Sequence, residues 1–277
     1  MLLAIDVGNT ETVVGLFSIG DGDVPPSGTR PAPPIPPEPA GLFQHWRLST
    51  VSERTADEHA LLLTELLSLS RLDPVEVISG IAVTSSVPRV TSALRQMAVR
   101  WFDVPCMVLE PGIRSGMPIL YDNPKEVGAD RIANGIGAFD LYGGPCVVVD
   151  MGTATTFDAI SPEGAYLGGA IAPGVAISLD ALFDQAAALR RVELVEPRSP
   201  IGKSTVESIQ AGALYGFAGQ VDGICRRFVE ELGPSTVIAT GGLSEVIAPY
   251  STCIEHVEPW LTLHGLRLVY ERNLRQG

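Results

Sequence analysis

The chain has 277 residues, of which 45% are hydrophobic and 18% are charged, and its formal net charge is −13. This length and composition fit one large or two ordinary globular domains with a buried core. The negative charge argues against nucleic acid or an acidic membrane as a partner, because both require basic patches. A local anion site remains compatible with this charge, because backbone amides bind anions through fixed dipoles.

Targeting signals and metal motifs are absent from the sequence. Asp6 interrupts the first apolar run before a signal sequence forms, and no uncharged stretch has the length of a membrane span. The four cysteines show no C-x-x-C spacing, which is typical of reduced thiols, and the four histidines show no metal-ligand spacing. We therefore expect a cytoplasmic protein with no membrane partner.

The first half of the chain predicts three strands, then helix, strand, helix and strand. The opening apolar run pairs with a second run at 13–18, and a third strand is expected at 42–50. Between them, the Pro-rich segment 21–41 predicts an elongated loop, because proline cannot join a ladder. Thr55 and Glu58 have the spacing of a helical capping box. The remaining elements are helices at 54–70 and 91–102 and strands at 77–88 and 106–110.

The second half repeats this order after an irregular stretch near 111–123. We expect a domain boundary there, which gives domains at 1–115 and 116–277. The predicted elements are a helix at 128–142, a second hairpin, a strand at 165–175, helices at 178–194 and 205–232, and a strand at 235–245 that contains a Gly-Gly turn. The fold class is α/β with a duplicated domain.

One motif occurs twice. IDVGNT and VDMGTA each follow an apolar run, and Asp150 stands 144 positions after Asp6. The same offset aligns Gly8 with Gly152 and Asn9 with Thr153. An apolar run, a polar Gly-containing turn and a second run are typical of a β-hairpin. Backbone amides and hydroxyls suit phosphate, and a carboxylate suits the accompanying cation, so the repeat predicts two domains that close on a nucleotide.

GADR at 128–131 places a carboxylate at the start of a predicted helix. Asp130 can simply be a partner of the helix dipole. It can also face a cleft, accept a proton from an attacking hydroxyl group and have Arg131 beside it to orient an anionic substrate. The sequence leaves both interpretations open.

Two Gly-containing stretches need separate treatment. ATGGLSE at 239–245 is either a plain turn or a flat surface for adenine. GKST at 202–205 is no phosphate loop, because Pro197 stands where that motif needs glycine. Thr205 is then a helix N-cap, or a substrate contact if it faces the cleft. No dinucleotide fingerprint is present, since the glycines near Gly135 break its spacing.

The chain resembles the type III pantothenate kinases, which belong to the acetate and sugar kinase/actin-like superfamily. The resemblance covers nearly the whole length. It rests on IDVGNT, HWRLST with RTADEHALL, YDNPKEVGADR, VVVDMGTATTFD, GGAIAPGV and ATGGLSE, in that order. It implies duplicated actin-like (ribonuclease H-like) domains with mixed sheets, flanking helices and a cleft between the domains. The Pro-rich segment departs from the family pattern but lies outside every matched motif.

The resemblance implies ATP-dependent phosphorylation of pantothenate, the first step of coenzyme A biosynthesis, by a homodimer that completes the substrate pocket. Asp130 resembles the general base, Asp6 resembles the residue near Mg²⁺, and Asp150 resembles the ligand of a monovalent cation, K⁺ or NH₄⁺. The implied ATP contacts are Asp6, Val7, Gly8, Asn9, Thr10, Glu11, Thr12, Val13 and Thr153. The implied substrate contacts are Tyr121, Gly128, Ala129, Asp130, Arg131 and Thr205.

Two alternatives keep the fold and change the function. One is a kinase for another small acceptor, or a polyphosphate phosphatase; GADR and Tyr121 argue against it, because both match on the substrate side. The other is a non-catalytic nucleotide-binding regulator. The presence of both Asp130 and Asp150 argues against a decayed site.

Overall fold

The computed structural model describes residues 1–19, 39–186 and 188–274. The elongated loop predicted for 21–41 lies almost entirely outside these residues. Contacts divide the chain into two compact units. Unit 1 contains Met1–Met117, Asn123–Gly137 and Trp260–Gly277, and unit 2 contains Pro118–Asp122 and Ala138–Pro259. The domain bounds 1–115 and 116–277 rest on the sequence alone, and they stay a prediction.

Unit 1 is built on a five-stranded mixed sheet in the order β3-β2-β1-β4-β5. Both hairpin pairs, β1–β2 and β2–β3, are antiparallel, whereas β4 runs parallel to β1 and β5 parallel to β4. The strands are β1 (Leu2–Val7), β2 (Glu11–Phe17), β3 (Leu42–Ser49), β4 (Gly80–Ser85) and β5 (Cys106–Val108).

Unit 2 contains a second five-stranded sheet with the same topology, β10-β9-β6-β7-β8. Its hairpins β6–β7 and β7–β8 are antiparallel, and β9 and β10 continue parallel to β6. Each strand thus has a counterpart in unit 1, which confirms the predicted α/β duplication. The strands are β6 (Cys146–Met151), β7 (Ala154–Ile160), β8 (Tyr166–Pro173), β9 (Thr236–Thr240) and β10 (His256–Val257).

Helices cover both faces of the unit 1 sheet. Alternate residues of β1 point to opposite sides of the sheet, and because most of these residues are apolar, both faces must be buried. Leu3, Ile5 and Val7 join one buried core with residues of α1 (Ala56–Leu69) and α3 (Pro88–Met97). Helix α8 (Leu261–Leu274) packs on the strands from the other side, where a Cβ added at Gly15 would lie 2.8 Å from Leu263 Cδ1. The predicted capping box of α1, formed by Thr55 and Glu58, is confirmed.

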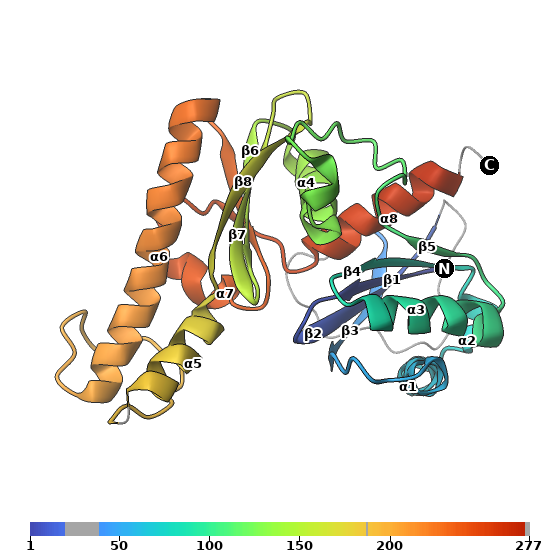
Figure 1. Cartoon of the computed structure of the whole chain (residues 1–277), viewed down its shortest axis with the longest axis horizontal. Helices are drawn as coiled ribbons and strands as arrows, with labels where there is room; N and C mark the ends of the chain where they lie inside the picture. Colours follow the sequence, from blue (N-terminus) through green and yellow to red (C-terminus); the bar gives the residue numbers. More distant parts are fainter. Residues whose placement is uncertain (20–38, 187, 275–277) are drawn as a thin grey trace. The chain divides into compact units, whose positions relative to one another are not determined.

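One face of the unit 2 sheet packs on a long helix. Val147, Val149 and Met151 of β6 share a core with Leu214 and Val221 of α6 (Thr205–Leu232). Figure 1 shows α5 (Val175–Gln185) beside the N-terminal part of α6. The remaining elements of the described residues are the helix α4 (Ala129–Tyr142) and the short α2 (Pro74–Val77), η1 (Ala98–Phe102), η2 (Pro124–Glu126), α7 (Ser244–Ile247) and η3 (Ala248–Tyr250).

Three expectations about the elements need correction. The helix predicted at 178–194 begins at Val175 and ends at Gln185. Gln210 of α6 donates to the carbonyl of Glu193 at 2.8 Å, a tertiary contact that holds this segment outside a helix. Strand β10 and helix α8 were missed, because β10 has two residues and α8 is buried along most of its length, so neither shows a periodic pattern. Within the described part of the chain, no helix combines the length and apolar character needed to cross a bilayer.

Candidate active site

The first candidate phosphate turn joins β1 to β2 and presents polar groups at the end of a buried strand. Asp6 is half-buried in a strand whose other residues are buried, and Asn9 and Thr10 are exposed. Val7 pairs with Thr12, so the turn between paired residues contains four residues, Gly8 to Glu11. The Gly8 N–H donates to the Glu11 carbonyl at 3.0 Å and closes the turn. Val13, the last residue of the implied ATP contact, pairs with Asp6 across the hairpin.

The second turn joins β6 to β7 and is one residue shorter. Met151 pairs with Thr155, which leaves three residues, 152–154, in the turn. The Gly152 N–H donates to the Ala154 carbonyl at 3.0 Å, and Thr153 is exposed at the tip. Because the second turn is one residue shorter, the numbering difference between equivalent residues of the two hairpins is smaller after the turn than before it. Thr155, and not Thr156, is the structural counterpart of Thr12.

Each aspartate has a threonine beside it on the neighbouring parallel strand. Asp6 pairs with Thr84 of β4, and Asp150 pairs with Thr240 of β9. Residues in register on adjacent strands present their side chains on the same face. Both threonines are almost completely buried. This Asp–Thr pair is a feature of the repeat that the sequence motif alone did not show.

Gly241 lies directly against Asp150. Its φ is +89°, and an added Cβ would lie 2.5 Å from Asp150 Oδ1 and 2.7 Å from the Met151 backbone. Only glycine allows the chain to pass so close to the carboxylate in this left-handed conformation. ATGGLSE therefore does more than turn the chain: it brings backbone of the β9–α7 connection to the candidate cation ligand.

The GADR segment forms the N-terminus of α4, as predicted. Asp130 is half-buried, and its Oδ1 accepts from the Arg131 N–H at 2.9 Å. A Cβ added at Gly128 would collide with the same oxygen, so glycine is required for the aspartate to fold back over the chain. Arg131 is buried, and Ala129 is half-buried at the first helical position. The structure thus gives the Asp130 carboxylate a defined orientation.

Tyr121 packs on β8 in unit 2. Its ring carbons would lie 3.6 and 3.7 Å from a Cβ added at Gly168, and its ring meets that of Tyr166 edge-on with centroids 6.2 Å apart. The Tyr166 hydroxyl donates to Asp158, a completely buried carboxylate, at 2.8 Å. Tyr121 keeps 37% of its surface exposed while one side of its ring is supported. Sequence reasoning missed the Tyr166–Asp158 support.

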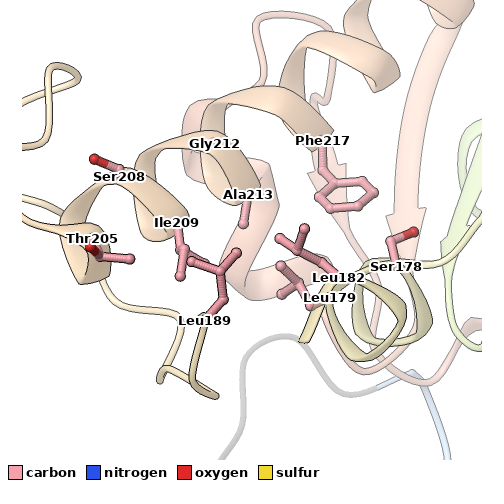
Figure 2. Close-up of a pocket in the computed structure, with 10 residues that line it drawn as sticks. All are labelled: Ser178, Leu179, Leu182, Leu189, Thr205, Ser208, Ile209, Gly212, Ala213 and Phe217. Carbon is pink, nitrogen blue, oxygen red and sulfur yellow. The ribbon is translucent and has the colours of Figure 1, made fainter. Parts of the chain in front are cut away.

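Thr205 is the first residue of α6, and the N-cap is Ser204, whose hydroxyl accepts from the Glu207 N–H. The expectation that Thr205 caps the helix is therefore wrong. Thr205 lines a pocket of about 550 Å³ between α5 and α6. Figure 2 shows Leu179 and Leu182 of α5 facing Ile209, Ala213 and Phe217 of α6 across this pocket. The remaining lining residues are Ser178, Leu189, Ser208 and Gly212.

The described residues contain no group of three or more Cys, His, Asp or Glu side chains that could hold a metal ion alone. The cysteines are free thiols. Burial raises the pKa of Cys106 to about 11 and those of Cys146 and Cys225 to about 12, so these thiols are poor nucleophiles.

The candidate residues fall into two groups. The first turn and GADR lie in unit 1, whereas Tyr121, Asp150, Thr153 and Thr205 lie in unit 2. Two contact residues were not identified from the sequence, Thr50 after β3 and Gly174 after β8, each of which touches one of the two turns. Their signal is positional: both directly follow the third strand of their repeat.

Comparison with known sequences identifies one family. A family model for type III pantothenate kinase matches residues 2–227. A type III pantothenate kinase from Streptomyces griseus is 52% identical over 285 aligned residues, with all of both chains covered. Another from Saccharopolyspora erythraea is 53% identical, and the match covers 99% of each chain.

Solved structures are similar in fold at much lower identity. An archaeal actin homolog superposes with a TM-score of 0.51 at 12% identity, and 99% of each chain is covered. A structure described as a Baf family transcriptional activator from Campylobacter jejuni gives a TM-score of 0.58 at 18% identity, again over 99% of each chain. These similarities confirm the duplicated actin-like fold.

Proposed function

This chain belongs to the type III pantothenate kinase family, and we propose that it transfers the γ-phosphoryl group of ATP to pantothenate, giving 4′-phosphopantothenate for coenzyme A biosynthesis. The observation that carries this proposal is identity of about one half over the whole length of relatives with that name. Both hairpins form in the structure and GADR begins helix α4, which supports the proposal.

The alternatives considered from the sequence are not favoured. A kinase for another acceptor, a polyphosphate phosphatase or a non-catalytic regulator would share the fold, and structural similarity at 11–18% identity speaks only of fold. The full-length identity to pantothenate kinases favours pantothenate as the acceptor. The matched region includes the segment 121–131, where the implied substrate contacts lie.

Asp130 is proposed as the general base. Its Oδ1 accepts a bond from its own helix, which orients the carboxylate, so the second oxygen is the one assigned to the primary hydroxyl group of pantothenate. In phosphoryl transfer the protein mainly positions groups and stabilises charge. Asp130 therefore aligns the hydroxyl for in-line attack and takes its proton as the new P–O bond forms.

The backbone of the first turn, Asp6 to Val13, is assigned to the phosphates of ATP, with Thr153 of the second turn as a further contact. The exposed tips of both turns support this assignment. Tyr121, Gly128 to Arg131 and Thr205 are assigned to pantothenate. Tyr121 suits this role because its ring is exposed on one side and supported on the other.

The proposed cations are Mg²⁺ and a monovalent ion, K⁺ or NH₄⁺. Asp6 fits Mg²⁺, which commonly binds through one or two carboxylates, substrate phosphates and water. Asp150 is assigned to the monovalent cation, and the backbone of Gly241 passes close to its Oδ1. Bound Mg²⁺ neutralises charge on the phosphates.

We further propose that the enzyme is a cytoplasmic homodimer that pairs through α5 and α6. Exposed apolar side chains on and beside these helices are Ile177 and Leu182 of α5, Ile201 before α6 and Val206 of α6, and Leu182 lines the same pocket as Thr205. Clustered apolar surface of this kind marks interaction sites. A partner seated here would enclose Thr205.

The function is tested with the purified chain, ATP, Mg²⁺, K⁺ and a panel of small acceptors that includes pantothenate. We expect ADP release with pantothenate and little with the other acceptors. Growth rescue of a strain that lacks pantothenate kinase is the second test. ADP release without preference for pantothenate, or failure of rescue by a well-expressed chain, would contradict the proposal.

A further inference from the structure

Thr50 stands directly after β3 and contacts the first phosphate turn at two points and Thr12 of β2 at a third. Its backbone N–H donates to the Thr10 carbonyl at 2.9 Å. Its hydroxyl donates to the Gly8 carbonyl at 2.8 Å, and its Oγ1 also lies 2.8 Å from Thr12 Oγ1. No role follows for Thr50 from composition or motif spacing.

The direction of these bonds follows from counting protons. A threonine hydroxyl has one proton, and that of Thr50 is used on the Gly8 carbonyl. Thr12 must therefore donate to Thr50 Oγ1, because the oxygen of Thr50 is the only acceptor left between them. Thr12 is buried in the hairpin, so the hydrogen bonds from Thr12 to Thr50 and from Thr50 to the Gly8 carbonyl begin at a buried side chain.

These bonds orient two peptide groups of the turn. In a trans peptide the C=O and the following N–H point in opposite directions. Because the Gly8 carbonyl points to Thr50, the Asn9 N–H points away from Thr50. Because the Thr10 carbonyl points to the Thr50 N–H, the Glu11 N–H points away from β3.

Among the residues that the structure describes, the Gly8 carbonyl is bonded by the Thr50 hydroxyl and lacks the return bond of a tight hairpin turn. In a tight two-residue hairpin, the Glu11 N–H would bond the Gly8 carbonyl in return for the bond between the Gly8 N–H and the Glu11 carbonyl. Here the Gly8 carbonyl accepts from Thr50, and within the described chain the Glu11 N–H makes no turn bond to Gly8. The Glu11 N–H is therefore not used within the described turn, and backbone donors of this kind can bind an anion.

The matching position in unit 2 has a different solution. Gly174 directly follows β8, as Thr50 follows β3. A Cβ added at Gly174 would collide with the Thr153 carbonyl oxygen and lie 2.6 Å from the Gly152 carbonyl oxygen. The second turn thus rests on bare backbone, whereas the first turn depends on a hydroxyl group. A side-chain hydroxyl at this position is special to the first turn.

We propose that Thr50 is a positioning residue, which holds the first turn open so that the Asn9 and Glu11 N–H groups face the phosphates of ATP. This inference rests on the proposed phosphate role of the turn. Thr50 itself does not need to touch the nucleotide. Its effect should therefore appear in ATP binding and leave pantothenate binding unchanged.

The test compares Thr50→Val with Thr50→Ser. Valine keeps the shape of the side chain and removes the hydroxyl, and serine restores the hydroxyl. The matched control is Thr91→Val, which removes a hydroxyl bonded to a backbone carbonyl within α3 of the same unit. Calorimetric titration with MgATP alone gives the Kd, and steady-state assays give KM for each substrate. Circular dichroism checks the fold.

We expect Thr50→Val to raise the Kd and KM for ATP roughly 10-fold, through the lost bond and the misplaced donors. The KM for pantothenate should stay within about twofold, as for any change confined to the ATP site. Thr50→Ser and Thr91→Val should stay within about threefold of wild type, since the key bonds remain. If Thr50→Val does not fold, Thr50→Ala, which also removes the hydroxyl, serves instead, with the same expected rise of roughly 10-fold in the Kd for ATP.

Unchanged ATP affinity in Thr50→Val would overturn the inference, as would an equal loss in Thr50→Ser or an equal rise in the KM for pantothenate. A wild-type chain that binds ATP but does not phosphorylate pantothenate would contradict the proposed function alone. The ATP titration would then still decide the role of Thr50. A wild-type chain that does not bind ATP would overturn both.

Discussion

Two aspartates of the candidate site owe their positions to glycines. Gly128 leaves room for the Asp130 carboxylate two residues away, and Gly241 leaves room for Asp150 across the sheet. The first pair can be suspected from GADR, because both residues stand in one short motif. The second pair is invisible in the sequence, since it depends on β9 running beside β6. In both cases the position of the carboxylate depends on a neighbouring glycine, which has no side chain to occupy the same space.

At Asp130 we expect substitution by asparagine to lower kcat by roughly 10²–10⁴-fold, the range for loss of a positioned base. The amide oxygen can still accept the Arg131 N–H, so the local structure should persist while the ability to take a proton is lost. Steady-state kinetics at saturating ATP and pantothenate measure the effect. Asp140→Asn, an exposed position on the same helix, is the control. Near-normal turnover in a folded Asp130→Asn enzyme would remove Asp130 from this role.

At Gly241 we expect alanine to weaken cation activation. The positive φ and the contact with Asp150 Oδ1 mean that a methyl group must displace the carboxylate or the backbone. The K⁺ concentration for half-maximal activity should rise roughly 10-fold, in line with the cost of a strained backbone position. Activity is measured against KCl at constant ionic strength, with Na⁺ as the replacement ion.

Gly242→Ala is a close control for this experiment, because a Cβ at Gly242 meets no atom within 4 Å in the structure described. It should keep the wild-type response to K⁺. Full activity of the wild-type enzyme in Na⁺ alone would contradict the assignment of Asp150. If Gly242→Ala raised the K⁺ requirement as much as Gly241→Ala, the effect would come from the flexibility of the Gly-Gly turn and not from the contact between Gly241 and Asp150.

At the scale of helices and strands, local signals were predictable and tertiary ones were not. The capping box of α1 and the full span of α6 follow from residues close together in sequence. The end of α5 depends on Gln210 holding the Glu193 carbonyl, a contact between segments that no local pattern encodes. Helix α8 has buried residues on most sides and so lacks an amphipathic pattern. The equivalence of Thr50 and Gly174 appears only when the strand order is known.

Helix α1 contains a buried histidine that should make stability depend on pH. His59 is 6% exposed, and burial, with a smaller contribution from Arg54, lowers its pKa from 6.5 to about 4. Between these values the unfolded chain binds a proton that the native chain does not. Falling pH therefore favours unfolding, by at most about 1.4 kcal/mol per pH unit for this group.

Urea unfolding at pH 5, 6 and 7.5 measures this dependence. His59→Leu should flatten the loss of stability between pH 6.5 and 4, because it removes the group that takes up the proton. His256→Gln, which changes an exposed histidine in β10, should leave the slope of the wild type. An unchanged slope in His59→Leu would show that other groups control the acid sensitivity.

At the scale of the whole chain, the two halves share one strand topology but differ in their turns. Both sheets have the same strand order, yet the turns differ in length and their supports differ in kind. The sequence repeat was sufficient to predict two related α/β halves. It could not predict that α8 returns to unit 1, since that helix has no counterpart in the repeat pattern.

Unit 2 also presents a surface that a single chain leaves uncovered. Gly212, Gly216, Gly219 and Gly223 recur every three or four positions along α6, so they lie on one face of the helix. A Cβ at any of the first three would meet no atom within 4 Å in the described structure. Each glycine costs a helix about 1 kcal/mol relative to alanine. Close approach of a second helix would explain why they are present, and the proposed dimer supplies one.

Gly216→Leu tests this dimer with little risk to the fold, because the new side chain starts in open space within the chain. We expect it to shift the mass in analytical ultracentrifugation from two chains to one, and to lower pantothenate kinase activity because the pocket around Thr205 stays open. Ser92→Leu adds the same side chain at an exposed site on α3 and should leave both unchanged. A wild-type enzyme that is monomeric at full activity, or a Gly216→Leu variant that remains a dimer, would show that α6 does not form the interface.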